Sequence, residues 1–218
     1  NALEKKTPLH FIGLLSDGNV HSNISHLLAM IMECDKSAVE EVYIHCLLDG
    51  RDVPPLRALR YLGILGDFLW SVRVQAVKQQ KKRKYYIASG GGRMVTTMDR
   101  YEADWSIVER GYNAHVLGEG PLYANPFEAV MALRAKQLVD DQYLPHWVIS
   151  NPDDPARPLT EILDGHNVIC FNFRGDRAME ISRAFVEDNF TGFRRKRRPH
   201  VLYAGMLEYD GDTHMPPR

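Results

Sequence analysis

Short apolar runs alternate along the chain with longer stretches whose apolar residues recur at helical spacing. Unbroken apolar runs bounded by turn residues predict buried strands at 10–16, 42–48, 85–89, 146–149, 167–173 and 200–204. Apolar residues spaced three and four apart predict helices at 24–34, 56–78, 103–117, 126–138 and 176–187. This alternation predicts an α/β fold, a mostly parallel sheet with helices on both faces. The glycines at 90–92 read as a loop, and 151–158 as a loop or short hairpin.

Composition and charge narrow the class of protein. With 218 residues, the chain is long enough for one substantial domain. Its composition, 44% hydrophobic and 25% charged, is that of a globular protein and excludes a disordered chain, a collagen-like fibre and a disulfide miniprotein. Lys and Arg total 27 against 28 Asp and Glu, so bulk binding to nucleic acid or a membrane surface is not expected. The three cysteines contain no CxxC pair and are expected as reduced core thiols of an intracellular protein. The sequence shows no membrane span and no signal peptide.

Two basic runs leave a choice open. The runs KKRK at 81–84 and RRKRR at 194–198 fit nucleic-acid or targeting patches, or else a solvated helix end and a loop. The nearly neutral overall charge favours the second interpretation.

The polar motifs follow the ends of the predicted strands, in SDGNVHSN, DGRD, SGGGRMVTTMDR and NFRGDR. Ligands of open α/β sheets bind at this edge. Each motif alone has an ordinary explanation: Asp17 and Asp49 precede glycines as turn formers do, and Asp17 or Asp176 suits a helix cap. Together, however, several arginines at one edge repel one another unless an anion or carboxylates offset them. The residues therefore predict a site for a small phosphorylated acid or sugar, without fixing the reaction.

Four strings, GLLSDGNVHSN, HCLLDGRDVPP, ASGGGRMVTTMDRYEADW and FNFRGDRAMEI, closely resemble the family of cofactor-independent (2,3-bisphosphoglycerate-independent) phosphoglycerate mutases. The SGGGRM form and the YAGMLEYDGD ending resemble its plant and trypanosomatid branch more than its bacterial one. Where the family usually reads SDGGVHS, Asn19 replaces the second glycine, and Asn tolerates a left-handed backbone.

The resemblance implies a two-domain enzyme of which this chain is one piece. Residues 1–218 resemble the inserted substrate-binding (phosphotransferase) domain, with Asn1 and Arg218 near the crossing points between the domains. The other domain resembles alkaline phosphatase and holds a nucleophilic serine and two divalent metal ions (manganese, magnesium or cobalt), so neither a catalytic nucleophile nor a metal site is expected in this chain. The implied activity interconverts 3-phosphoglycerate and 2-phosphoglycerate through a phosphoserine, in a cytoplasmic, monomeric enzyme of glycolysis and gluconeogenesis.

The resemblance also assigns substrate-binding roles position by position. The alternatives are another metal-dependent phosphotransferase of the same superfamily, such as a phosphopentomutase, which lacks this GRD, MDR and FRGDR set, or a nucleic-acid-binding module that uses the basic runs. The residues expected to bind substrate are His21, Arg51, Asp52, Arg93, Arg100, Arg174 and Arg177.

Overall fold

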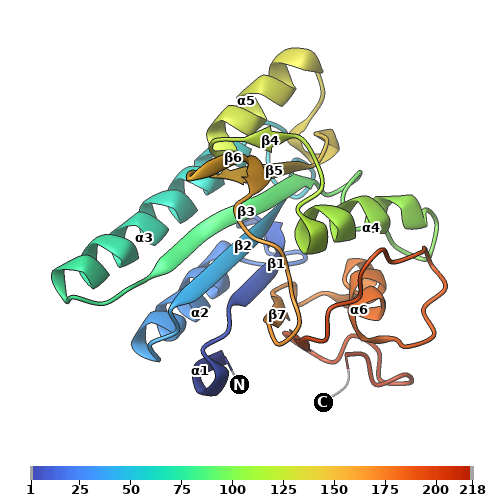
Figure 1. Cartoon of the computed structure of the whole chain (residues 1–218). Coiled ribbons are helices and arrows are strands. Elements are labelled where there is room, and N and C mark those ends of the chain that lie inside the picture. Colours follow the sequence, from blue (N-terminus) through green and yellow to red (C-terminus); the bar gives the residue numbers. More distant parts are fainter. Residues whose placement is uncertain (1, 217–218) are drawn as a thin grey trace.

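Strand β1 (Leu9–Leu15) lies near the middle of the sheet, and all seven of its residues are buried. Its sequence LHFIGLL carries no charged residue, so helices can cover both of its faces. The computed structural model describes residues 2–216 and contains an eight-stranded sheet in the order β4-β5-β3-β2-β1-β7-β8, with β6 pairing with β5 (Figure 1). The other strands are β2 (Glu41–Leu48), β3 (Lys84–Gly92), β4 (Leu122–Tyr123), β5 (Trp147–Asn151), β6 (Asp154–Pro158), β7 (Asn167–Cys170) and β8 (Leu202–Gly205).

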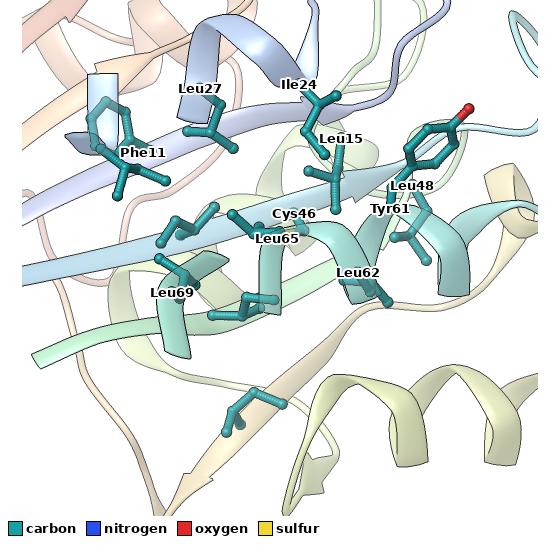
Figure 2. Close-up of a cluster of buried hydrophobic side chains, with 14 of the residues drawn as sticks. Phe11, Leu15, Ile24, Leu27, Cys46, Leu48, Tyr61, Leu62, Leu65 and Leu69 are labelled. Carbon is teal, nitrogen blue, oxygen red and sulfur yellow. The ribbon is translucent and has the colours of Figure 1, made fainter. Parts of the chain in front are cut away.

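Helices cover both faces of the sheet, as the sequence predicts (Figure 1). One face packs against α2 (Ile24–Lys36), α3 (Ala58–Lys78) and α5 (Pro126–Lys136), with Leu27, Leu62 and Leu65 fully buried (Figure 2). The other face packs against α4 (Trp105–Tyr112), the π-helical turn η1 (Asn113–Leu117) and α6 (Met179–Val186).

The strand order places a topological switch point beside β1. From β1 the chain proceeds outward through β2 and β3, whereas β7 and β8 lie on the opposite side of β1. The adjacent strands β3, β2, β1, β7 and β8 are all parallel, so their carboxyl ends share one edge. Ligands of such sheets bind outside this edge. The loops that follow β1, β2, β3 and β7 are therefore brought together.

Several elements differ from the sequence prediction. The glycines at 90–92 belong to β3, where they pair with 46–48 of β2, and a Cβ on Gly90 would lie 2.3 Å from the Trp147 ring. The predicted helix at 103–117 divides into α4 and η1, and the predicted helix at 176–187 begins as the 3-10 turn η3 (Gly175–Arg177). The 151–158 segment forms a hairpin of β5 and β6. The short α1 (Ala2–Lys5) and β4 were not predicted.

The three cysteines are free and buried, and burial raises the pKa of each thiol. Across residues 2–216 no helix is both long enough and apolar enough to cross a bilayer. The expected position of Asn1 and Arg218 at domain crossings lies outside the described residues.

The second basic run is largely tied to the rest of the chain. Arg197 pairs with Glu161 at 2.8 Å, and Lys196 pairs with Glu119 at 2.6 Å. Arg198 pairs with Asp188 at 2.5 Å. In the first run, Arg83 is buried against Asp35 at 2.7 Å. These contacts favour the interpretation of both runs as ordinary surface structure.

Candidate functional site

Three of the strand-end loops meet at a buried guanidinium. Arg93, directly after β3, is 1% exposed. Its Nη2 lies 2.6 Å from Nε2 of His21, in the loop after β1. Its Nη1 donates to Asp52 and lies 3.2 Å from Asp49, both in the loop after β2. Residues from three separate loops are thus held around Arg93. The sequence predicts Arg93 as a substrate-binding arginine, whereas in the structure its guanidinium is buried against protein groups.

The contact with Arg93 settles the protonation of His21. A guanidinium only donates, so Nε2 of His21 accepts and its proton sits on Nδ1. That Nδ1 lies 3.5 Å from Oδ1 of Asp176. Burial, and then the positive charge of Arg93, lower the pKa of His21 to about 4. His21 is therefore neutral at physiological pH and presents its N–H toward Asp176.

Asp49 shapes the loop that carries Arg51 and Asp52. Its Oδ1 accepts from the backbone N–H groups of Gly50, Arg51 and Asp52 at 2.8–3.1 Å, and its Oδ2 accepts from Ser16 at 2.7 Å. Burial acts to raise the pKa of Asp49, but these hydrogen bonds outweigh it and the net shift is downward. The turn-forming role is confirmed for Asp49.

Asp176, which is not among the predicted site residues, forms ion pairs with Arg174 and Arg100. Its carboxylate lies 2.9 Å from Nε of Arg174, 4.0 Å from Nη1 of Arg100 and 3.5 Å from His21. Neither Asp176 nor Asp17 caps a helix: α6 begins after Ala178 without a side-chain cap, and α2 is capped by Asn23. The signal was present in the sequence, because Asp176 lies between the two arginines of FRGDR.

Arg177 and Arg51 complete the cluster without direct contact to its other members. Arg177 is buried, and its Nη1 donates to the carbonyl of Met98 at 2.5 Å. Burial lowers the pKa of Arg177, and the nearby charges of Arg93, Arg100 and Arg51 lower it further. Arg51 is exposed, and its side chain makes no hydrogen bond or ion pair with the described residues.

The seven predicted residues therefore lie in one neighbourhood, which we call the arginine cluster: His21, Arg51, Asp52, Arg93, Arg100, Arg174 and Arg177, together with Asp49 and Asp176. Five guanidinium groups face three carboxylates there, which leaves an excess of positive charge. A groove of about 710 Å³ lies elsewhere, along β8. Within residues 2–216 no three His, Cys, Asp or Glu side chains gather closely enough to hold a metal ion.

Comparisons with known proteins agree with the sequence motifs. A family model described as "BPG-independent PGAM N-terminus" matches residues 1–211. A "probable 2,3-bisphosphoglycerate-independent phosphoglycerate mutase" of Leptospira interrogans is 48% identical over 100% of this chain and 38% of its own length. The 2,3-bisphosphoglycerate-independent phosphoglycerate mutase of Trypanosoma brucei brucei is 46% identical over 95% of this chain and 36% of its own length.

A solved structure gives the same answer for the fold. A crystal structure of Leishmania mexicana phosphoglycerate mutase, determined at low cobalt concentration, superposes with a TM-score of 0.91 at 44% identity. The match covers 96% of this chain and 37% of the Leishmania chain. The chain thus spans somewhat more than a third of the length of its relatives, and it belongs to the family of 2,3-bisphosphoglycerate-independent phosphoglycerate mutases.

Proposed function

We propose that this chain is the substrate-binding domain of a phosphoglycerate mutase that interconverts 3-phosphoglycerate and 2-phosphoglycerate. The observation that carries the proposal is the arginine cluster at the carboxyl edge of the parallel strands. A phosphoglycerate carries a phosphate and a carboxylate, and both match the planar donor fork of arginine. Burial lowers the pKa of Arg177 first, and the nearby positive charges lower it further; bound substrate would offset these charges.

The catalytic steps belong to a second domain outside this chain. A serine oxygen there takes the phosphoryl group as the bond to the glycerate 3-oxygen breaks, and the freed hydroxyl gains a proton. After the glycerate turns, the 2-hydroxyl loses its proton and takes the phosphoryl group back from the serine. This chain's residues would hold the glycerate and keep its hydroxyl in line with the phosphorus. They would also exclude the water that otherwise hydrolyses the phosphoserine.

The metal forms a second part of the proposal. As the family resemblance implies, we assign divalent metal binding (manganese, magnesium or cobalt) to the second domain. The crystal structure of the Leishmania enzyme was determined at low cobalt concentration, which supports a metal in that relative. The family resemblance extends the proposal to a cytoplasmic, monomeric enzyme.

The test is binding of 3-phosphoglycerate to the chain by isothermal titration calorimetry at low salt. Arg51→Ala is the informative variant because Arg51 is exposed and free of ion pairs among the described residues, so its loss should not disturb the fold. We expect a loss of affinity of roughly tenfold or more, the usual range for a charged hydrogen bond. Arg157→Ala removes the same charge from the exposed hairpin strand β6 and should leave affinity within about twofold. Equal losses in both variants, or no binding by the wild-type chain, would contradict the proposal.

A further inference from the structure

An unbroken chain of hydrogen bonds crosses the sheet beneath the arginine cluster. His166 Nδ1 lies 3.0 Å from His10 Nε2, and His10 Nδ1 lies 3.0 Å from His45 Nε2. His45 Nδ1 lies 2.7 Å from the Ser89 hydroxyl, which lies 2.8 Å from His115 Nδ1. Finally, His115 Nε2 lies 2.9 Å from the hydroxyl of Thr97. We call this set the histidine chain; it links the residue before β7, and the strands β1, β2 and β3, to the loop that bears Arg93 and Arg100.

The contacts of His166, at one end of the histidine chain, indicate in which direction the hydrogen bonds of the histidine chain run. The backbone N–H of Leu163 points to His166 Nδ1 at 3.4 Å, which favours this nitrogen as an acceptor whose lone pair is shared between Leu163 and the closer His10. His10 then donates through Nε2 to His166, and its Nδ1 accepts from Nε2 of His45. Nδ1 of His45 in turn accepts from the Ser89 hydroxyl. In this order Nδ1 of His115 donates to Ser89, and Nε2 of His115 is left as an acceptor for Thr97. Burial lowers the pKa of His10, His45 and His115 far below the usual value, which keeps these members neutral.

Two irregularities of the backbone make this alignment possible. The pairing of β2 with β3 shifts after Ile44, so that His45 faces Ser89 rather than Ala88. Bulges of this kind re-aim side chains. His115 itself lies in the π-helical turn η1, a rare conformation that recurs at functional sites. Both departures from regular structure place members of one hydrogen-bonded chain.

Thr97, at the far end of the chain, occupies an unfavourable backbone conformation. Its φ is +69°, in the left-handed region that a β-branched residue rarely adopts. The backbone N–H of Thr97 donates to the carbonyl of Ile107 at 2.8 Å. Its hydroxyl packs against Gly111, where a Cβ would lie 1.8 Å from the hydroxyl oxygen, so a glycine is required there. The next residue, Met98, presents the carbonyl that Arg177 binds. The conformation of Thr97 therefore decides where that carbonyl lies.

We propose that His115 and Thr97 are positioning residues for the substrate site: the acceptor nitrogen of His115 holds Thr97 in its left-handed conformation, and so holds the Met98 carbonyl that orients Arg177. This inference rests on the proposed function for its binding readout, and it has a second readout that does not. The two members act through Arg177 and make no contact with substrate themselves.

The experiment compares four forms of the chain: wild type, Thr97→Val, Thr97→Ser and Thr96→Val. Thr97→Val keeps the β-branch and removes the hydroxyl, whereas Thr97→Ser restores the hydroxyl. Thr96→Val is the matched control, because Thr96 is equally buried in the same loop and its hydroxyl has no hydrogen-bond partner within the described structure. The probe is 3-phosphoglycerate, measured by calorimetry. NMR records the nitrogen shifts of the His115 ring, the Arg177 Nε–H and the exchange rate of the Met98 amide.

We expect His115 to show an unprotonated Nε2 in the wild type. Thr97→Val should weaken 3-phosphoglycerate binding about fivefold to tenfold, in line with the loss of one hydrogen bond, shift the Arg177 signal and speed exchange at Met98. Thr97→Ser and Thr96→Val should stay within about twofold of wild type in affinity, a margin well below one hydrogen bond.

A protonated Nε2 in His115 would overturn the inference, as would wild-type Arg177 and Met98 signals in Thr97→Val or an equal loss in Thr97→Ser. If the wild-type chain does not bind 3-phosphoglycerate, the proposed function fails, and the NMR signals of Arg177 and Met98 still decide the positioning role.

Discussion

Glu180 gives the fold a pH dependence that the structure allows us to calculate. Its side chain is 3% exposed on α6, beneath the loop that carries Arg100. Its Oε1 accepts from the backbone N–H of Glu102 at 3.0 Å. Burial raises the pKa of Glu180 from 4.5 to about 7; the Glu102 N–H works against this rise, and the carboxylate of Asp99 adds to it.

The sign follows from which state holds the proton. Below pH 4.5 the folded and unfolded chains both keep Glu180 protonated, and its stabilising contribution is fully present. Between pH 4.5 and 7 the unfolded chain releases the proton while the folded chain keeps it, so folding loses stability as the pH rises. At about 1.4 kcal/mol per pH unit, the loss amounts to roughly 3 kcal/mol by about pH 8.

The assay is urea unfolding of wild type and Glu180→Gln at several values of pH. Gln keeps the Oε1 acceptor for Glu102 and stays neutral, so Glu180→Gln should lack this loss. Its free energy of unfolding should gain on the wild-type value by about 3 kcal/mol between about pH 4 and 8. Glu128→Gln is the control, because Glu128 is exposed and accepts one backbone N–H at 3.3 Å. A difference between wild type and Glu180→Gln that stays constant with pH, or that grows toward low pH, would refute the reasoning.

Three further predictions concern the arginine cluster and the activity. Arg93→Met should lower the free energy of unfolding by about 3 kcal/mol because it leaves the carboxylate of Asp52 without its arginine partner. Arg51→Ala should change the free energy of unfolding by less than about 0.5 kcal/mol. Equal effects of the two variants in denaturant unfolding would contradict this. In the longer enzyme, Arg174→Lys should reduce kcat/KM although the charge is kept, and Arg174→Ala should cost about 2–3 kcal/mol; a fully active Lys variant would count against a bidentate role. The purified chain alone should not convert 3-phosphoglycerate with or without manganese, and metal-dependent turnover in a coupled assay would disprove the assignment of the chemistry to another domain.

The order of the elements and the edge that holds the polar motifs were predictable from sequence. A fully buried strand must be apolar on both faces, so a run such as 10–16 is recognisable on its own. Parallel strands joined by helices must end at one edge, so residues placed after these strands, such as His21 and Arg93, must lie along that edge. These inferences use local pattern and the rules of chain connection, and they were confirmed for the fold.

The roles of individual polar residues were decided by tertiary structure. Arg93 is a buried centre of contacts because β1, β2 and β3 bring His21 and Asp52 against it. His10 and His166 meet although 156 residues separate them, and periodicity carries no information about such a pairing. Gly90 lies in a turn-like glycine run, yet it pairs with Cys46 in a strand, and the Trp147 ring leaves no room there for a side chain. Most buried polar groups form a hydrogen bond, and only the packed chain determines which partner comes within reach.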